Sequence, residues 1–268
     1  MSSANHAAKE QQAVALINQG KLQAAEAIYK DLITTGTTNH IVYGNLAVIA
    51  LMRGEHDKSI PLLKKAIQLK PNFPDAHWNS SLTMLLGGDY KNGWEEFEWR
   101  AQKKIEPIKP HALPKCDKWS DELNLNQVKQ LLLVTEQGIG DTLQFMRYAN
   151  ALRHHGAKVS FCAPTKIHSL IQASGIDPSP LTPQQANEVT EGQWISLLSV
   201  PRRLDISPIN PIITEPYIKS TDKLITKWSD ILSTEEQPII GINWQGNPKI
   251  EKTGLPGRSL ALETFAPI

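Results

Sequence analysis

The chain has 268 residues, and at about 150 residues per domain this length predicts about two domains. Apolar residues make up 40% of the chain, which excludes disordered and collagen-like classes. The formal net charge is +1, so the molecule has no overall electrostatic field that favours nucleic acid or an anionic membrane as a partner. The sequence has no run of about 20 apolar residues, the length that a membrane-spanning helix needs. We therefore expect a globular protein with no nucleic-acid partner and no integral membrane segment.

The two cysteines, Cys116 and Cys162, lie in different segments without the spacing of a zinc site or a disulfide framework. The first residues lack the basic and apolar regions of a secretory leader. These features predict a cytoplasmic protein without a bound metal.

A 34-residue period runs through the first hundred residues. Gly20, Gly54 and Gly88 are 34 residues apart, and the same register aligns one small and one large apolar residue in each repeat. The small residues are Ala25, Ser59 and Gly93, and the large ones are Tyr29, Leu63 and Phe97. Apolar spacing of three and four residues around a turn glycine predicts a pair of antiparallel helices per repeat. The period and its occupants resemble tetratricopeptide repeats, about three of them over residues 1–103.

The sixth position of each repeat holds a carboxamide, in Gln11, Asn45 and Asn79. A carboxamide can both donate to and accept from a peptide unit. Asn45 and Asn79 are therefore candidates for a groove that binds an extended polypeptide, either a partner protein or an acceptor substrate. The alternative is that asparagine is simply tolerated at this position, and the sequence leaves both interpretations open.

Prolines end the repeat pattern, and residues 104–128 are predicted to be a linker. Trp94 and Trp99 precede this segment and Trp119 lies within it. Large aromatic side chains at helical spacing favour packing at a domain junction over a ligand platform.

The second half alternates apolar runs and amphipathic segments with short loops. The expected strands are 130–135, 158–162, 194–198 and 239–243, and the expected helices are 142–155 and 165–173. This alternation predicts a parallel sheet with right-handed crossovers. The fold class is therefore α + α/β, with helical repeats followed by a Rossmann-like domain over residues 129–236.

A glycine loop, EQGIGD (136–141), follows the first strand. It departs from a dinucleotide-binding fingerprint because Leu143 occupies the third glycine position, and no P-loop pattern occurs. A glycine turn at the carboxyl end of a strand brings backbone close to a ligand, which makes Gln137, Gly138 and Gly140 candidates for a substrate or acceptor loop.

Asp141 has two possible roles at this loop. With Gln144 three residues later it resembles a capping box, in which the carboxylate accepts hydrogen bonds from first-turn amides. A carboxylate held there is also placed to accept a proton from a substrate hydroxyl. The two roles do not exclude each other.

Two segments, GDYKNGWEEFEWR (88–100) and EQGIGDTLQFMRY (136–148), resemble bacterial glycosyltransferases in which tetratricopeptide repeats precede a heptosyltransferase-like module of glycosyltransferase family nine. The segment IGINWQGNP (240–248) and the later Arg258 also resemble that family. The resemblance implies a GT-B fold, in which the first half holds the acceptor and the second a nucleotide-sugar, without a metal or other cofactor. It also implies Asp141 as general base on the acceptor hydroxyl.

The same resemblance places the donor-side candidates in the segment 237–268. These candidates are Asn243, Gln245, Gly246 and Arg258. A complete second half needs about 100–150 residues, so we expect this segment to be the start of a truncated donor-side domain and the polypeptide to be a poor catalyst or none. The alternative is a non-catalytic adaptor, in which the repeats bind a polypeptide and the Rossmann-like part is structural.

Overall fold

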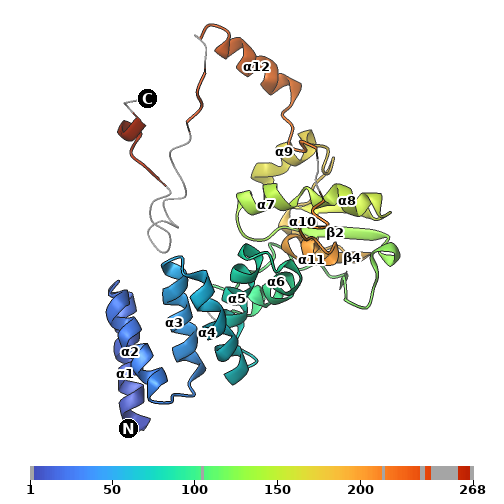
Figure 1. The fold of residues 1–268 in the computed structure, drawn as a ribbon. Coiled ribbons are helices and arrows are strands. Elements are labelled where there is room, and N and C mark those ends of the chain that lie inside the picture. Colours follow the sequence, from blue (N-terminus) through green and yellow to red (C-terminus); the bar gives the residue numbers. More distant parts are fainter. Residues whose placement is uncertain (1–2, 104–105, 213–214, 236–238, 243–258, 266–268) are drawn as a thin grey trace. The chain divides into compact units, whose positions relative to one another are not determined.

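The computed structural model describes residues 3–103, 106–212, 215–235, 239–242 and 259–265 (Figure 1). The chain divides into two compact units, Met1–Lys219 and Ser220–Ile268. None of the helices in these ranges combines the length and apolar character that crossing a membrane requires.

Six helices form the N-terminal part of the first unit, and consecutive helices pack against each other (Figure 1). They are α1 (Ser3–Asn18), α2 (Leu22–Thr34), α3 (His40–Met52), α4 (His56–Leu69), α5 (Pro74–Leu86) and α6 (Tyr90–Phe97). Gly20, Gly54 and Gly88 lie in the turn inside each pair, with φ of +74°, +72° and +86°. Because only glycine adopts this region readily, the predicted helix pairs and their turn glycines are confirmed.

The repeated small and large residues pack the second helix of each pair against its neighbours. Ala25, Ser59 and Gly93 are buried. A Cβ on Gly93 would lie 2.8 Å from the side chain of Leu85, so the absence of a side chain lets α6 approach α5 closely. The large residues Tyr29, Leu63 and Phe97 are also buried, as the period predicts.

A four-stranded, fully parallel sheet follows, in the order β1-β4-β2-β3. Its strands are β1 (Asp117–Lys118), β2 (Gln130–Val134), β3 (Lys158–Cys162) and β4 (Gln193–Ser196). The predicted parallel sheet is confirmed, and β2 and β3 lie within the ranges predicted for them. Short continuous apolar runs are typical of parallel strands because both faces of the sheet are covered.

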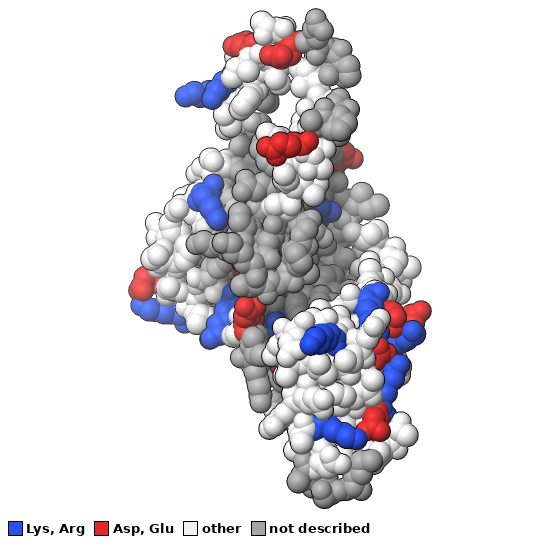
Figure 2. Space-filling view, turned by 90° about the vertical axis from the view of Figure 1, so that its left-hand side faces the viewer, with Lys and Arg blue, Asp and Glu red and all other residues white. Residues whose placement is uncertain are grey.

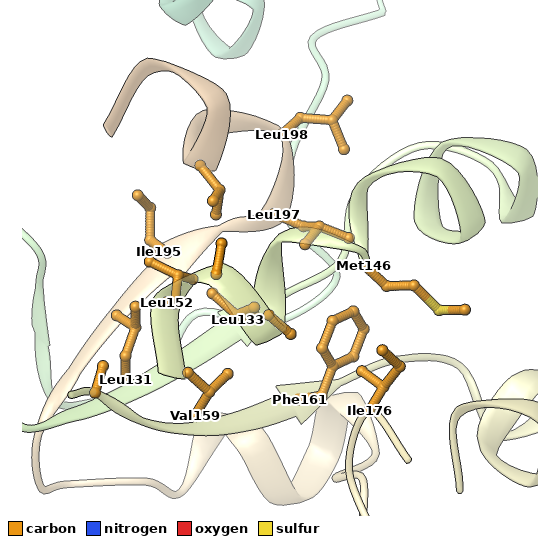
Figure 3. Packing of buried hydrophobic residues seen from close by; sticks show 14 of the residues in the cluster. Leu131, Leu133, Met146, Leu152, Val159, Phe161, Ile176, Ile195, Leu197 and Leu198 are labelled. Carbon is orange, nitrogen blue, oxygen red and sulfur yellow. The ribbon is translucent and has the colours of Figure 1, made fainter. Parts of the chain in front are cut away.

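Alternate strand residues enter two different cores. Leu131, Leu133 and Phe161 point to one face, where Figure 3 shows them packed with Met146 and other apolar side chains. The opposite cluster contains Leu132, Val134, Cys162 and Trp194, together with Ala112, Cys116 and Ala186.

Several expected elements have different boundaries. The helix expected at 142–155 is divided into α7 (Ile139–Phe145) and α8 (Tyr148–His154), and Arg147 Nε donates to the Gln144 carbonyl at the end of α7. That side-chain bond satisfies a carbonyl that the helix leaves unpaired. The helix expected at 165–173 begins as a 3-10 turn, η3 (Thr165–Ile167), before α9 (His168–Ala173), and α10 (Pro183–Asn187) follows.

The strand expected at 194–198 ends earlier, at Ser196. A 3-10 turn, η4 (Leu197–Ser199), leads directly into α11 (Val200–Arg203), which has a proline in its first turn. Proline lacks the N–H that a sheet ladder needs but fits the first turn of a helix.

The segment predicted as a linker, 104–128, belongs to the part of the first unit that contains the sheet, which we call the sheet unit. It contributes β1 and a 3-10 turn, η2 (Leu125–Gln127), and Trp119 N donates to the Trp194 carbonyl at 2.8 Å. Prolines that prevent a helix leave this segment extended, and an extended segment can pair with β4.

Two of the three tryptophans predicted at the domain junction, Trp94 and Trp119, pack there. Trp94 and Phe97 join the main sheet core, and Trp94 Nε1 donates to the Ile206 carbonyl at 3.0 Å. Trp119 is buried in the same core, whereas Trp99 stacks on His77 within the third repeat.

The second unit contains α12 (Asp222–Leu232) and a 3-10 turn, η5 (Leu262–Phe265). The prediction of a strand at 239–243 is wrong for its described part, because residues 239–242 form no strand. Asn243 lies outside the described residues. An apolar run becomes a strand only where a neighbouring strand pairs with it, and none of the described strands pairs with 239–242.

Candidate functional site

Four positions recur at 34-residue spacing on the first helix of every repeat. Their separations of four, three and four residues place them on one side of each helix. They are Ala7, Gln11, Val14 and Asn18 of α1, Ile41, Asn45, Val48 and Met52 of α3, and Asp75, Asn79, Leu82 and Leu86 of α5. All of them are exposed or half-buried. We call this set the first-helix face.

The first-helix face holds all the large apolar side chains that the described repeat residues expose. These are Val14, Ile41, Met52, Leu82 and Leu86. Met52 and Leu86, which occupy the same repeat position, are 62% and 67% exposed. The second helices, α2, α4 and α6, have none in their described residues, so the exposed apolar area is concentrated on one side of the repeats.

The three carboxamides lie on this face, but their surroundings differ. Asn45 Nδ2 donates to the Tyr29 hydroxyl at 2.9 Å, which orients the amide and leaves its carbonyl oxygen as an acceptor. Burial raises the pKa of Tyr29, so the phenol keeps its proton. No hydrogen bond within the described part of the chain engages the side chains of Gln11 or Asn79.

The glycine loop lies at the carboxyl end of β2. The chain passes from β2 to β3 on one side and then to β4 on the other, so the carboxyl ends of β2 and β4 flank a topological switch point, where open parallel sheets bind ligands. Gln137, Gly138 and Gly140 are exposed there. Gln137 has a φ of +61°, which is unusual for a residue with a side chain.

Asp141 lies in the first turn of α7 and is partly exposed. Its Oδ2 accepts the Gly138 N–H at 3.0 Å. Gly138 is therefore the N-cap of α7 and Asp141 the third helical residue, which corrects the predicted capping box that began at Asp141. Gly140 has no heavy atom within 4 Å of the position that a Cβ would take, so the loop is open beside it. The role of Asp141 as a base stays a prediction.

A buried ion pair lies at the same switch point, and the sequence analysis did not predict it. Arg100 and Glu136 are 3% and 1% exposed. Arg100 Nη2 lies 2.7 Å from Glu136 Oε1, and Arg100 Nε lies 3.2 Å from Glu136 Oε2. Glu136 Oε1 also accepts the Leu198 N–H, and Arg100 Nη2 donates to Ser199 Oγ. Burial opposes the charge of Arg100, but the carboxylates of Glu136 and Glu98 together outweigh it and raise the pKa of the guanidinium.

His111, from the segment predicted as a linker, holds the end of β2 from another direction. The backbone N–H of His111 donates to the Thr135 carbonyl at 2.8 Å, and the ring Nδ1 of His111 shares a hydrogen bond of 2.8 Å with Thr135 Oγ1. Partial burial lowers the pKa of His111 and favours the neutral ring. No spacing rule points to this residue, because it reaches Thr135 only through the fold.

A cavity of about 290 Å³ lies beside the carboxyl ends of β1 and β4, with Trp119, Arg202 and Arg203 in its wall. Arg202 forms ion pairs with Glu95 and Asp121, and Arg203 with Asp121. Since these charges already pair with each other, we assign the cavity to the junction rather than to a ligand.

The donor-side candidates Gln245, Gly246 and Arg258 lie, like Asn243, outside the described residues. The described ranges contain no group of three or more His, Cys, Asp or Glu residues suited to a metal ion.

Comparison with solved structures finds tetratricopeptide-repeat proteins, each over 35% of this chain. One is the second tetratricopeptide domain of Spaghetti (RPAP3) bound to the HSP90 peptide SRMEEVD, with 17% identity, a TM-score of 0.34 and 87% of that chain covered. MamA has 26% identity, a TM-score of 0.33 and 55% coverage, and the Sgt2 domain from Aspergillus fumigatus has 20%, 0.33 and 63%. The chain thus spans less than two thirds of the latter two.

No family model and no curated protein matches the sequence. The structural likenesses are limited at these TM-scores, and the class of the helical part rests on its own features. The 34-residue period, the paired helices and the turn glycines define repeats of the tetratricopeptide type.

Proposed function

We propose that the repeats bind a polypeptide segment of a partner on the first-helix face. The observation that carries this proposal is the concentration of exposed apolar side chains on that face, next to the carboxamides of Gln11, Asn45 and Asn79. Contiguous exposed apolar surface marks interaction sites, and carboxamides can satisfy a bound backbone. Stacked repeats present such extended surfaces for binding.

A displayed library of random 12-residue peptides, selected on the full chain, tests this function. Fluorescence anisotropy then measures the affinity of enriched peptides. We expect Asn45→Ala with Asn79→Ala, and separately Met52→Glu, to weaken binding at least tenfold. Lys64→Glu on α4, an exposed substitution away from the face, is the matched control and should leave affinity unchanged. Failure to enrich any peptide, or equal binding by all variants, would contradict the proposal.

A second function, transfer of a sugar from a nucleotide-sugar to a hydroxyl acceptor, is favoured by a separate observation. Asp141 is partly exposed beside a switch point of a parallel sheet, and one of its oxygens bonds to Gly138. In this proposal the sheet unit is a Rossmann-like acceptor half of a GT-B fold, and Asp141 removes the acceptor proton. A polypeptide on the repeats would then be the acceptor.

Under this second function the nucleotide-sugar is a co-substrate, no metal or other cofactor is needed, and the protein acts in the cytoplasm. The test is a thermal-shift series of the full chain with UDP-, GDP-, ADP- and CMP-sugars, followed by a radiolabel transfer assay. Transfer that Asp141→Asn abolishes, with folding intact, supports it. Absence of any ligand shift and of any transfer contradicts sugar transfer by this polypeptide and leaves polypeptide binding untouched.

A further inference from the structure

The first-helix face is almost free of charge, and this feature bears on which segments it binds. Of its twelve residues seven are apolar, four carry carboxamides and one, Asp75, is charged. The face itself holds no lysine or arginine. The two most exposed apolar side chains of the face, Met52 and Leu86, occupy the same repeat position. Both are large, and methionine is also flexible, which suits contacts with apolar side chains of a partner.

Two cations on or beside the first helices are already engaged by acidic residues of the second helices. Lys9 pairs with Asp31 of α2, and Arg53, just after α3, pairs with Glu26 of α2. These pairs hold the positive charges beside acids of the same molecule. On the side of the molecule seen in Figure 2, acidic and basic residues are interspersed and form no field of one sign.

A bound acidic group would therefore lose water without gaining a cation from the face itself, which is unfavourable. Asp75, in the first turn of α5, would also repel such a group. Apolar side chains meet the opposite situation, because they cover exposed Val14, Ile41, Leu82 and their neighbours and lose contact with water.

Resting on the proposed polypeptide binding, we infer that the first-helix face binds an uncharged, apolar segment of a partner protein through its side chains and has no need of the partner's terminal carboxylate. The carboxamides Gln11, Asn45 and Asn79 serve the bound backbone, whereas the apolar rows select the side chains. The face thus discriminates against acidic C-terminal peptides.

The experiment uses the full chain and the peptides enriched from the 12-residue library. Each enriched peptide is synthesised with a free carboxylate and with a C-terminal amide, and the acidic peptide SRMEEVD serves as the contrasting probe. We expect enrichment of Leu, Ile, Met and Phe, affinities within twofold between the two termini, and no competition by SRMEEVD. Met52→Glu and Leu86→Glu should each weaken binding at least tenfold, while Met52→Leu retains it.

Enrichment of Asp and Glu, loss of binding on amidation, or competition by SRMEEVD would each overturn this inference while leaving polypeptide binding intact. A library that yields no binder at all contradicts the proposed function itself. Circular dichroism of the glutamate variants checks folding, which both substituted positions tolerate because they are more than half exposed.

Discussion

Arg100 reaches from the 3-10 turn η1 (Glu98–Gln102), at the end of the third repeat, to Glu136 after β2, and both side chains are almost completely buried. Removing one partner of such a pair leaves an uncompensated charge away from water. We expect Arg100→Met to lower the free energy of unfolding by about 3–5 kcal/mol in urea titrations.

Lys30→Met is the matched control for that prediction. It breaks the ion pair of Lys30 with Glu26 on α2, where the lysine side chain is 65% exposed. A surface pair contributes about 0–1 kcal/mol. Similar losses for the two variants would show that the buried pair does not stabilise the junction.

Cys162 gives a second prediction at the level of one residue. Burial raises the pKa of its thiol to about 12, so the folded protein holds the neutral form at pH 8. Iodoacetamide should therefore alkylate Cys162 slowly in the native state and rapidly in urea, because the thiolate is the nucleophile. Rapid native alkylation, detected by mass spectrometry of the peptide, would contradict the burial.

The sign of the pH effect follows from the same pKa. An unfolded cysteine ionises near pH 8.5, below the folded value. As pH rises past the unfolded value, the unfolded chain loses this proton first, and the contribution of Cys162 to stability falls. Below that value the contribution is fully present.

At the scale of elements, the turn glycines define each helix pair. Gly54 has a φ of +72° and open space around the position of a Cβ, so an alanine there meets backbone strain and no clash. We expect Gly54→Ala to cost about 1–2 kcal/mol of unfolding free energy. Gly140→Ala is the comparison, because Gly140 lies in α7 with similar open space and no positive φ. A smaller loss at Gly54 than at Gly140 would refute the strain account.

The sequence predicts a helix or strand well where the local pattern of residues is enough to determine that element. The helix pairs follow from a period that recurs in each repeat, and β2 follows from an apolar run that is buried on both sides. β3 is recognisable although its Lys158 and Ser160 are exposed. The two-residue strand β1 has no such pattern, because its place depends on β4. The run at 239–242 has strand-like composition, but composition does not supply a pairing partner.

Among the candidate site residues, some are predictable from local spacing and others depend on the fold. The spacing of Gln11, Asn45 and Asn79 locates the carboxamides in advance. The apolar rows beside them emerge only from exposure, since the apolar spacing of an outer face resembles that of a core. Arg100 and Glu136 lie 36 residues apart, and only the fold brings them together.

At the scale of the whole molecule, the third repeat belongs to the core of the sheet unit. Phe97 is a member of the main sheet core, and Trp78, Leu85 and Trp94 pack against it. We therefore expect a fragment 70–219 to unfold cooperatively in calorimetry and a fragment 104–219 to lack a cooperative transition. Cooperative unfolding of the shorter fragment would place the boundary at the end of the repeats instead.

Polypeptide binding on the repeats is tested most directly by methyl NMR of the full chain, titrated with one library-selected peptide. The expected result is saturable shifts of the methyl groups of Val14, Ile41, Met52, Leu82 and Leu86, with the buried methyls of β2 unchanged. Shifts confined to the second helices or to the sheet unit, with the first-helix face unaffected, would contradict the account.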